Sequence, residues 1–158
     1  MRLIGNILWH VPFMGFVQAI TMYLLGLALT LTVVAAPIGL GLMELGKFLF
    51  LPFGKRMINK PNQNEENQNA TWKAYSKIIM ILYLPFGLIF AISGAIQAIV
   101  LFIPLITIPV ALVVLKSLGV YLNPVNKICV SEIVAEEMER QQARDLINSQ
   151  NEKGLNNG

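Results

Sequence analysis

Two long stretches of the chain carry no charged side chain. They run from Leu3 to Met43 and from Ile78 to Leu115, and each is about 40 residues long. A membrane-spanning helix needs about 20 apolar residues, so each stretch has room for two spans. The pattern therefore predicts an all-α integral membrane protein made of two helical hairpins. The four expected helices are Leu3–Gly26, Leu29–Leu51, Ile78–Val100 and Pro104–Leu122. Since each stretch is only just long enough, the second arm of each hairpin could instead be short or re-entrant.

The charged residues lie in three segments that flank these stretches: the N-terminus with Arg2, the middle segment 55–77, and the C-terminal segment from Lys127. Positive charge next to membrane spans marks the cytoplasmic side. We therefore expect the N-terminus, the middle loop and the C-terminus to be cytoplasmic. The uncharged turns near Gly26–Thr32 and Leu101–Ile106 are then expected together on the other side.

The two apolar stretches also resemble each other. Displacing the chain by 72 residues brings prolines and a following lysine into register, which predicts a tandem duplication whose two hairpins run in the same direction. The matched pairs are Pro37 with Pro109, Pro52 with Pro124, and Lys55 with Lys127. The expected organisation is a first membrane repeat at 1–54, a basic polar loop at 55–77, a second repeat at 78–130 and a tail at 131–158. In the tail, Ser131 is a plausible N-cap for a helix to about residue 148, followed by disorder.

Composition narrows the class of protein further. Hydrophobic residues make up 55% of the chain and charged residues 13%, which is too little charge for a soluble domain. The net charge of +3 is too small for a nucleic-acid-binding surface. The single cysteine, Cys129, and the single histidine, His10, exclude an internal disulfide and a histidine cluster. With no catalytic motif present, we expect neither an enzyme nor a cofactor or metal site.

Three charges stand near or inside the apolar stretches: Glu44, Lys47 and Lys116. A lone charge within the membrane costs about 2.5–3.5 kcal/mol, so such residues are usually paired. Glu44 and Lys116 are 72 residues apart and opposite in sign. We expect them to approach each other or to share a polar cavity. They could form a structural ion pair, with the lysines reaching toward the surface, or they could line a path for an ion or small solute.

Each half of the chain carries specific short motifs. The first half has Ala36-Pro37-Ile38-Gly39-Leu40, Lys47 and Pro52-Phe53-Gly54, after the opening Ile4-Gly5-Asn6-Ile7-Leu8-Trp9. The second half has Ile108-Pro109-Val110, Lys116 and Pro124. Over about residues 1–130 these motifs resemble the YccF-type inner membrane component domain. The second half departs from that pattern at Thr107 and Asn126, where glycine is expected. The resemblance implies a bacterial plasma-membrane protein and brings no established activity.

Two functions agree with these observations. The first is a small transport or channel component, which would work as a homo-oligomer because four short helices make a poor pore alone. The alternative is an accessory or scaffold protein that transports nothing and binds a partner through its basic loop and C-terminal helix. In both cases the lipid bilayer is the main partner that the membrane helices contact.

Overall fold

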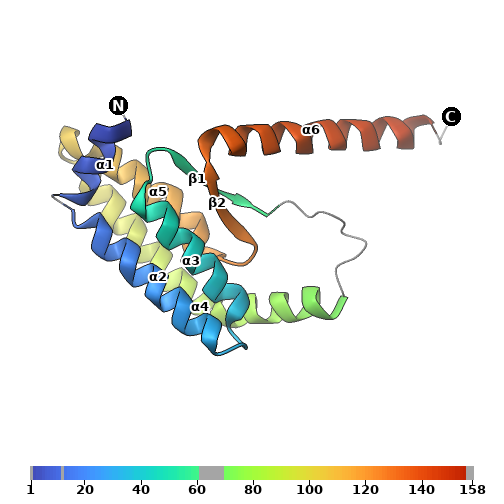
Figure 1. Cartoon of the computed structure of the whole chain (residues 1–158), viewed down its shortest axis with the longest axis horizontal. Helices are drawn as coiled ribbons and strands as arrows, with labels where there is room; N and C mark the ends of the chain where they lie inside the picture. Colours follow the sequence, from blue (N-terminus) through green and yellow to red (C-terminus); the bar gives the residue numbers. More distant parts are fainter. Residues whose placement is uncertain (1, 12, 61–69, 156–158) are drawn as a thin grey trace.

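The computed structural model describes residues 2–11, 13–60 and 70–155, and it is mostly helical (Figure 1). The elements in chain order are α1 (Arg2–His10), α2 (Gly15–Leu31), α3 (Ala36–Phe50), β1 (Lys55–Asn59), α4 (Ala70–Phe102), η1 (Leu105–Thr107), α5 (Ile108–Leu122), β2 (Lys127–Ser131) and α6 (Glu132–Leu155). Helices α2 to α5 form a block, and the two strands lie between this block and α6.

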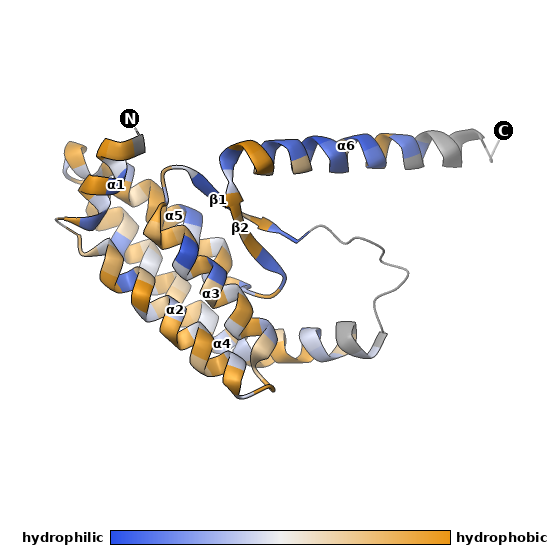
Figure 2. Ribbon diagram, viewed as in Figure 1, coloured by the Kyte–Doolittle hydropathy of each residue, from blue (hydrophilic) through white to orange (hydrophobic). Residues whose placement is uncertain are grey.

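The helical block is apolar enough for a membrane (Figure 2). Two segments are long and apolar enough to cross it, Ala74–Phe102 and Leu105–Leu122, and the pair α1–α2, bent by 79°, is a third candidate. The chain is therefore an integral membrane protein, and the expected span Ile78–Val100 lies within α4. At 1.5 Å per residue, the 15 residues of α3 reach about 22 Å, less than the ~30 Å apolar layer. The presence of four full spans stays a prediction.

The first expected span, Leu3–Gly26, is wrong as a single helix. Helix α1 ends at His10, in a stretch of sequence that holds Pro12, and proline cannot donate to a helical hydrogen bond. Helix α1, which is bent by 79° relative to α2, instead caps the end of α3. Trp9 Nε1 donates to the Leu49 carbonyl at 2.8 Å, and His10 Nε2 donates to the Phe50 carbonyl at 2.8 Å. These carbonyls have no partner within their own helix, because they belong to its last turn.

The predicted helical membrane architecture agrees with the mostly helical structure, but the sequence did not predict the two-stranded antiparallel sheet that β1 and β2 form. Its register runs from Lys55 opposite Ser131 to Asn59 opposite Lys127, with Met57 opposite Cys129 at its centre. Strand β1 takes the start of the expected polar loop, and β2 takes the end of the second repeat and the start of the tail. The two strands are far apart in the sequence, so no short turn joins them. Such a turn is the local signal by which a sequence identifies a hairpin.

The boundaries of the second half follow those of the first. Helix α5 covers the residues of α3 displaced by 72, and β2 covers those of β1 displaced by 72. The central pair of the sheet, Met57 and Cys129, is separated by the same 72 residues. The sheet is thus symmetric about its central pair.

The expectation that the two hairpins run in the same direction is wrong. Pro52, after α3, lies in one cavity with Pro109, at the start of α5, so α3 and α5 are antiparallel (Figure 1). The Tyr75 hydroxyl donates to the Val34 carbonyl, which places the α2–α3 turn beside the start of α4. The α4–α5 turn follows the other end of α4. The two uncharged turns therefore lie at opposite ends of α4, because each half is rotated relative to the other about the sheet.

The tail and the loop differ from expectation at their ends. Ser131 is the last residue of β2, and α6 continues to Leu155, past the expected end near 148. Helix α6 thus includes residues that were expected to follow the helix, and residues 156–158 lie outside the described residues. The loop is shorter than expected, because α4 already begins at Ala70. Its polar tract, 61–69, also lies outside the described residues.

Candidate functional site

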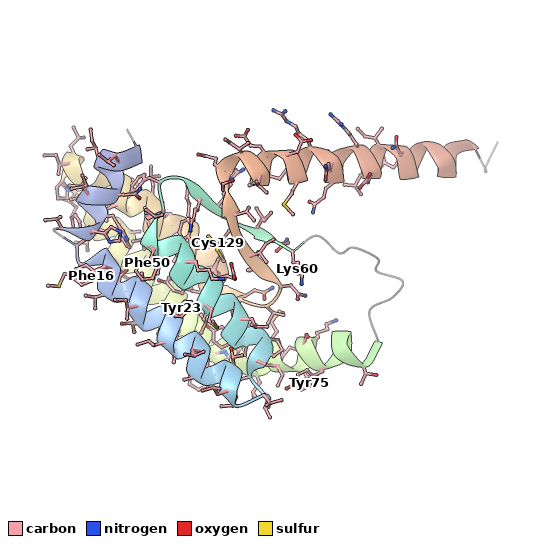
Figure 3. All side chains as sticks on the ribbon, in the orientation of Figure 1. Phe16, Tyr23, Phe50, Lys60, Tyr75 and Cys129 are labelled. Carbon is pink, nitrogen blue, oxygen red and sulfur yellow. The ribbon has the colours of Figure 1, made fainter. Side chains whose placement is uncertain are left out.

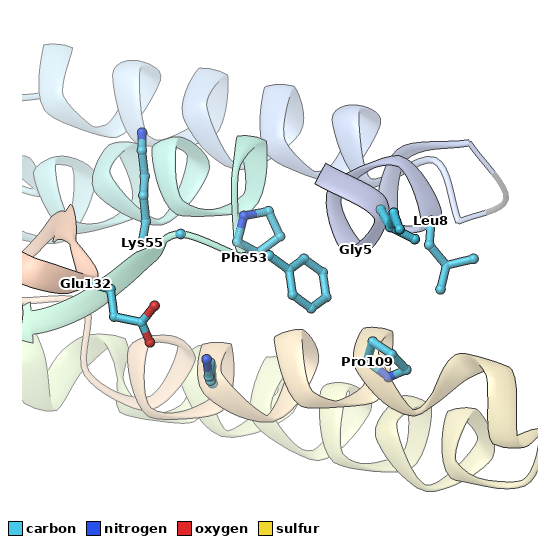
Figure 4. A pocket seen from close by; sticks show the side chains of 10 residues that line it. Gly5, Leu8, Phe53, Lys55, Pro109 and Glu132 are labelled. Atoms are coloured by element: carbon cyan, nitrogen blue, oxygen red, sulfur yellow. The ribbon is translucent and has the colours of Figure 1, made fainter. Parts of the chain in front are cut away.

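Two of the cavities that border the sheet occupy equivalent places in the symmetric arrangement. The Lys116 cavity has a volume of about 450 Å³ and is lined by Ile4, Gly5, Leu8, Pro52, Phe53, Gly54, Lys55, Pro109, Lys116 and Glu132. The Glu44 cavity has a volume of about 320 Å³ and is lined by Pro37, Leu40, Gly41, Met43, Glu44, Lys47, Lys60, Ser76, Asn126, Lys127 and Ile128. In the first of them, Lys55 and Glu132 lie at one end and Gly5, Leu8 and Pro109 at the other (Figure 4).

Glu44 is held by two hydrogen bonds. Its Oε1 accepts from Lys47 Nζ one turn further along α3, and its Oε2 accepts from the Cys129 amide at 3.0 Å. The sheet register explains why the Cys129 amide bonds to Glu44 rather than to strand β1. The Lys60 amide donates to the Asn126 carbonyl at 2.7 Å, and the Glu132 amide donates to the Gly54 carbonyl at 3.1 Å. Hydrogen-bonded and non-hydrogen-bonded pairs alternate in an antiparallel ladder, so the Cys129 amide points away from β1, toward α3.

The expectation that Glu44 and Lys116 meet is wrong. Lys116 is exposed on α5 and lies in the other cavity, which also holds Lys55 and Glu132. The rotation of one half against the other explains the separation. Glu44 on α3 and Lys116 on α5 therefore occupy equivalent cavities without sharing one.

The four prolines lie at the two ends of the short helices. Pro37 and Pro109 are in the first turns of α3 and α5, where a missing backbone donor costs nothing. Pro52 and Pro124 follow the ends of the same helices and are completely buried. The Pro124 carbonyl lies directly against Gly41 of α3, so the segment that follows α5 packs on the first turns of α3.

Three polar residues of the Glu44 cavity were missed by the sequence analysis: Lys60, Ser76 and Lys127 (Lys60 and Cys129 are labelled in Figure 3). The 72-residue displacement contained a signal for them, because it relates the linings of the two cavities. The related pairs are Ile4 and Ser76, Pro109 and Pro37, Lys116 and Glu44, Gly54 and Asn126, Lys55 and Lys127, and Glu132 and Lys60. Two of these pairs exchange an acidic for a basic side chain.

The chemistry of this region is electrostatic rather than covalent. Burial raises the pKa of the Cys129 thiol, and the Glu44 carboxylate raises it further, against the lowering effect of Lys55 and Lys47. The thiol therefore stays protonated at neutral pH and is a poor nucleophile. Among the described residues, no group of three histidine, cysteine, aspartate or glutamate side chains could hold a metal ion. The groups in this region that can bind a ligand include lysine ammonium groups, backbone amides and the Ser76 hydroxyl.

Residues 4–55 match the model of the YccF family, described as the inner membrane component domain. The match begins in α1, contains α2 and α3, and ends at the first residue of β1. It confirms the resemblance found in the sequence, in the half where the motifs are most complete. No curated protein and no solved structure matches the chain.

Proposed function

We propose that this inner membrane protein, with its YccF domain, is an accessory component that transports nothing itself and binds a positively charged surface of a cytoplasmic protein through α6. The observation that carries this proposal is the exposure of α6. From Glu136 to Asn148 every residue except Met138 is exposed, and the helix extends away from the membrane block (Figure 1).

Within the described part of the chain, helix α6 is anchored to the rest of the molecule near its start. Ala135 is completely buried, and Arg56 of β1 pairs with Glu139 at 3.2 Å. Beyond these anchors the helix has little apolar surface to bury within this chain. A helix that is polar on all sides gains little stability from its own sequence, and such helices commonly bridge to another protein.

The charge of α6 indicates the chemistry of the partner. The described side chains from 132 to 148 comprise the acidic residues Glu132, Glu136, Glu137, Glu139 and Asp145 and the basic residues Arg140 and Arg144. The helix is thus clearly acidic, and it complements a basic surface. Isolated apolar side chains such as Ile133, Leu146 and Ile147 are exposed beside these charges and can contribute contact area.

We also infer that the sheet and α6 are cytoplasmic and that the two halves are tandem repeats. Lys55, Arg56 and Lys127 lie on the strands beside the membrane helices, and positive charge at such positions favours the cytoplasmic side. The identical displacement of α3, β1 and the cavity linings supports the repeats. Transport receives less support, because Glu44 already has two partners and lies in a different cavity from Lys116.

A cross-linking experiment on the full chain tests this function. A photo-reactive amino acid at Gln141 should capture one protein in intact cells, and the yield should fall several-fold in the Glu136→Gln/Glu137→Gln variant and at high salt. The matched control is Arg140→Gln/Arg144→Gln on the same helix. Because it makes α6 more acidic, its yield should stay equal or rise.

Two results would contradict the proposal. One is cross-linking that responds equally to the acidic and the basic substitutions, or that yields a second copy of this chain alone. The other is solute flux in liposomes containing the purified protein that Glu44→Gln or Lys116→Met alters. That second result would establish the transport function instead.

A further inference from the structure

The Glu44 cavity has an excess of positive charge. Its lining holds three lysines, Lys47, Lys60 and Lys127, against the single carboxylate of Glu44. Glu44 is already engaged by Lys47 and the Cys129 amide, and Lys127 donates to the Asn59 side chain at 2.6 Å. Each ammonium group has three donors, so these bonds leave most of the lysine donors available. An anion with several oxygen acceptors would satisfy them.

A buried hydroxyl in the same cavity points to the same kind of ligand. Ser76 of α4 is 7% exposed, and its Oγ is buried without a hydrogen-bond partner. Two other helical hydroxyls bond to the carbonyl four residues earlier, Thr30 to Gly26 at 2.7 Å and Ser117 to Val113 at 3.0 Å. Buried polar groups are nearly always paired, so an unpaired one requires an explanation. A ligand oxygen that accepts from Ser76 supplies it.

We propose that the Glu44 cavity binds a phosphate group, with Ser76, Lys60 and Lys127 as its principal donors. Phosphate offers several strong acceptors and up to two negative charges, which suits both the lysines and the hydroxyl. The cavity is large enough at about 320 Å³. Leu40, which also lines it, is 53% exposed on the apolar surface, so a phospholipid head group could enter from the membrane. Free phosphate could enter from the aqueous side.

The Lys116 cavity provides an internal comparison. Position 76 corresponds to Ile4, which has no hydroxyl, and Lys60 corresponds to Glu132, which would repel an anion. The described lining of that cavity holds two lysines and one carboxylate. Of two sites built on the same plan, only the Glu44 cavity combines the hydroxyl with three lysines. Phosphate binding is therefore specific to the Glu44 cavity.

The test uses the purified full chain and two probes. Inorganic phosphate is titrated in detergent by calorimetry, and lipid retention is measured by native mass spectrometry after reconstitution with phosphatidylcholine alone or with phosphatidylglycerol added. The variants are Ser76→Ala, Lys60→Gln and their combination, with Lys116→Gln as the matched control. We expect the double variant to weaken binding at least about tenfold, which corresponds to ~1.4 kcal/mol, and the control to retain it.

Ser76→Ala also separates ligand binding from a structural role. Removing an unpaired hydroxyl should leave the melting temperature of the ligand-free protein unchanged or higher, while the increase in melting temperature caused by the ligand is lost. Binding of inorganic phosphate identifies a soluble ligand, and retention of phosphatidylglycerol alone identifies a head group. Equal binding by the wild type and the double variant, equal loss in Lys116→Gln, or no binding of either probe would overturn the proposal.

Discussion

Replacing Gly41 with alanine is expected to lower the free energy of unfolding by about 3 kcal/mol, at the upper end of overpacking effects. A Cβ atom at Gly41 would lie 1.8 Å from the Pro124 carbonyl oxygen and 2.5 Å from its carbon. These are backbone atoms, so no side-chain rotation relieves the clash. Helix α3 and the turn after α5 would have to separate, which would also disturb the sheet that follows. Thermal unfolding of the detergent-solubilised protein, followed by circular dichroism, measures the change.

Gly119→Ala is the matched control for this change. Gly119 lies within α5, and a Cβ atom there would meet nothing within 4 Å. Since alanine is the better helix former by about 1 kcal/mol, Gly119→Ala should raise stability slightly. If the two alanine variants unfolded at the same temperature, the close contact between α3 and Pro124 would not exist.

Trp9→Ala is expected to cost about 3–5 kcal/mol, the range for removing a large buried aromatic side chain. Trp9 is 1% exposed, although it lies in the short helix α1 near the start of the chain. Its loss would leave a cavity and free the Leu49 carbonyl at the end of α3. Helix α1 would then lose its principal anchor, and its residues should become accessible to protease in the purified protein.

Two further variants separate the parts of this effect. Trp9→Phe keeps an aromatic ring but removes the indole donor, so it should cost about 1–3 kcal/mol. Ile7→Ala changes a residue that is 52% exposed on the same helix, and it should have little effect in detergent. A Trp9→Ala protein as stable as Ile7→Ala would contradict the capping role of α1.

The sequence predicted where apolar helices occur because absence of charge is a local property. The α4 span follows directly from its uncharged stretch, and α3 and α5 begin and end at their prolines. The bend between α1 and α2 could not be predicted in the same way. It depends on bonds from Trp9 and His10 to the end of α3, about 40 residues away in sequence.

The site was harder to predict, because it depends on the sheet. Glu44 stood out as a charge in an apolar helix, but its partner is the backbone amide of Cys129, which no side-chain pattern reveals. Pairing it with Lys116 assumed that equivalent positions meet. In this arrangement equivalent positions meet at the centre of the sheet, as Met57 and Cys129 do, whereas Glu44 and Lys116 lie in separate cavities. The 72-residue displacement itself was the useful signal, and it relates the two cavities position by position.

The symmetric sheet that joins the two halves is the central feature of this structure, and one cross-link tests it. Met57 and Cys129 form its central, non-hydrogen-bonded pair, where Cα atoms lie about 4.5 Å apart, within the range for a disulfide. Met57→Cys should therefore form a disulfide with the native Cys129 on mild oxidation of the purified protein. Burial raises the pKa of the Cys129 thiol, so the reaction should be run at alkaline pH.

The readout is electrophoretic mobility of the monomer with and without reductant. Ile58→Cys is the matched control, because Ile58 pairs with Ile128 and successive side chains in a strand point to opposite faces. The expected result is a reductant-sensitive, faster-migrating monomer in Met57→Cys and none in Ile58→Cys. Absence of that band, equal bands in both variants, or a cross-linked dimer alone would contradict the pairing of β1 with β2 within one chain.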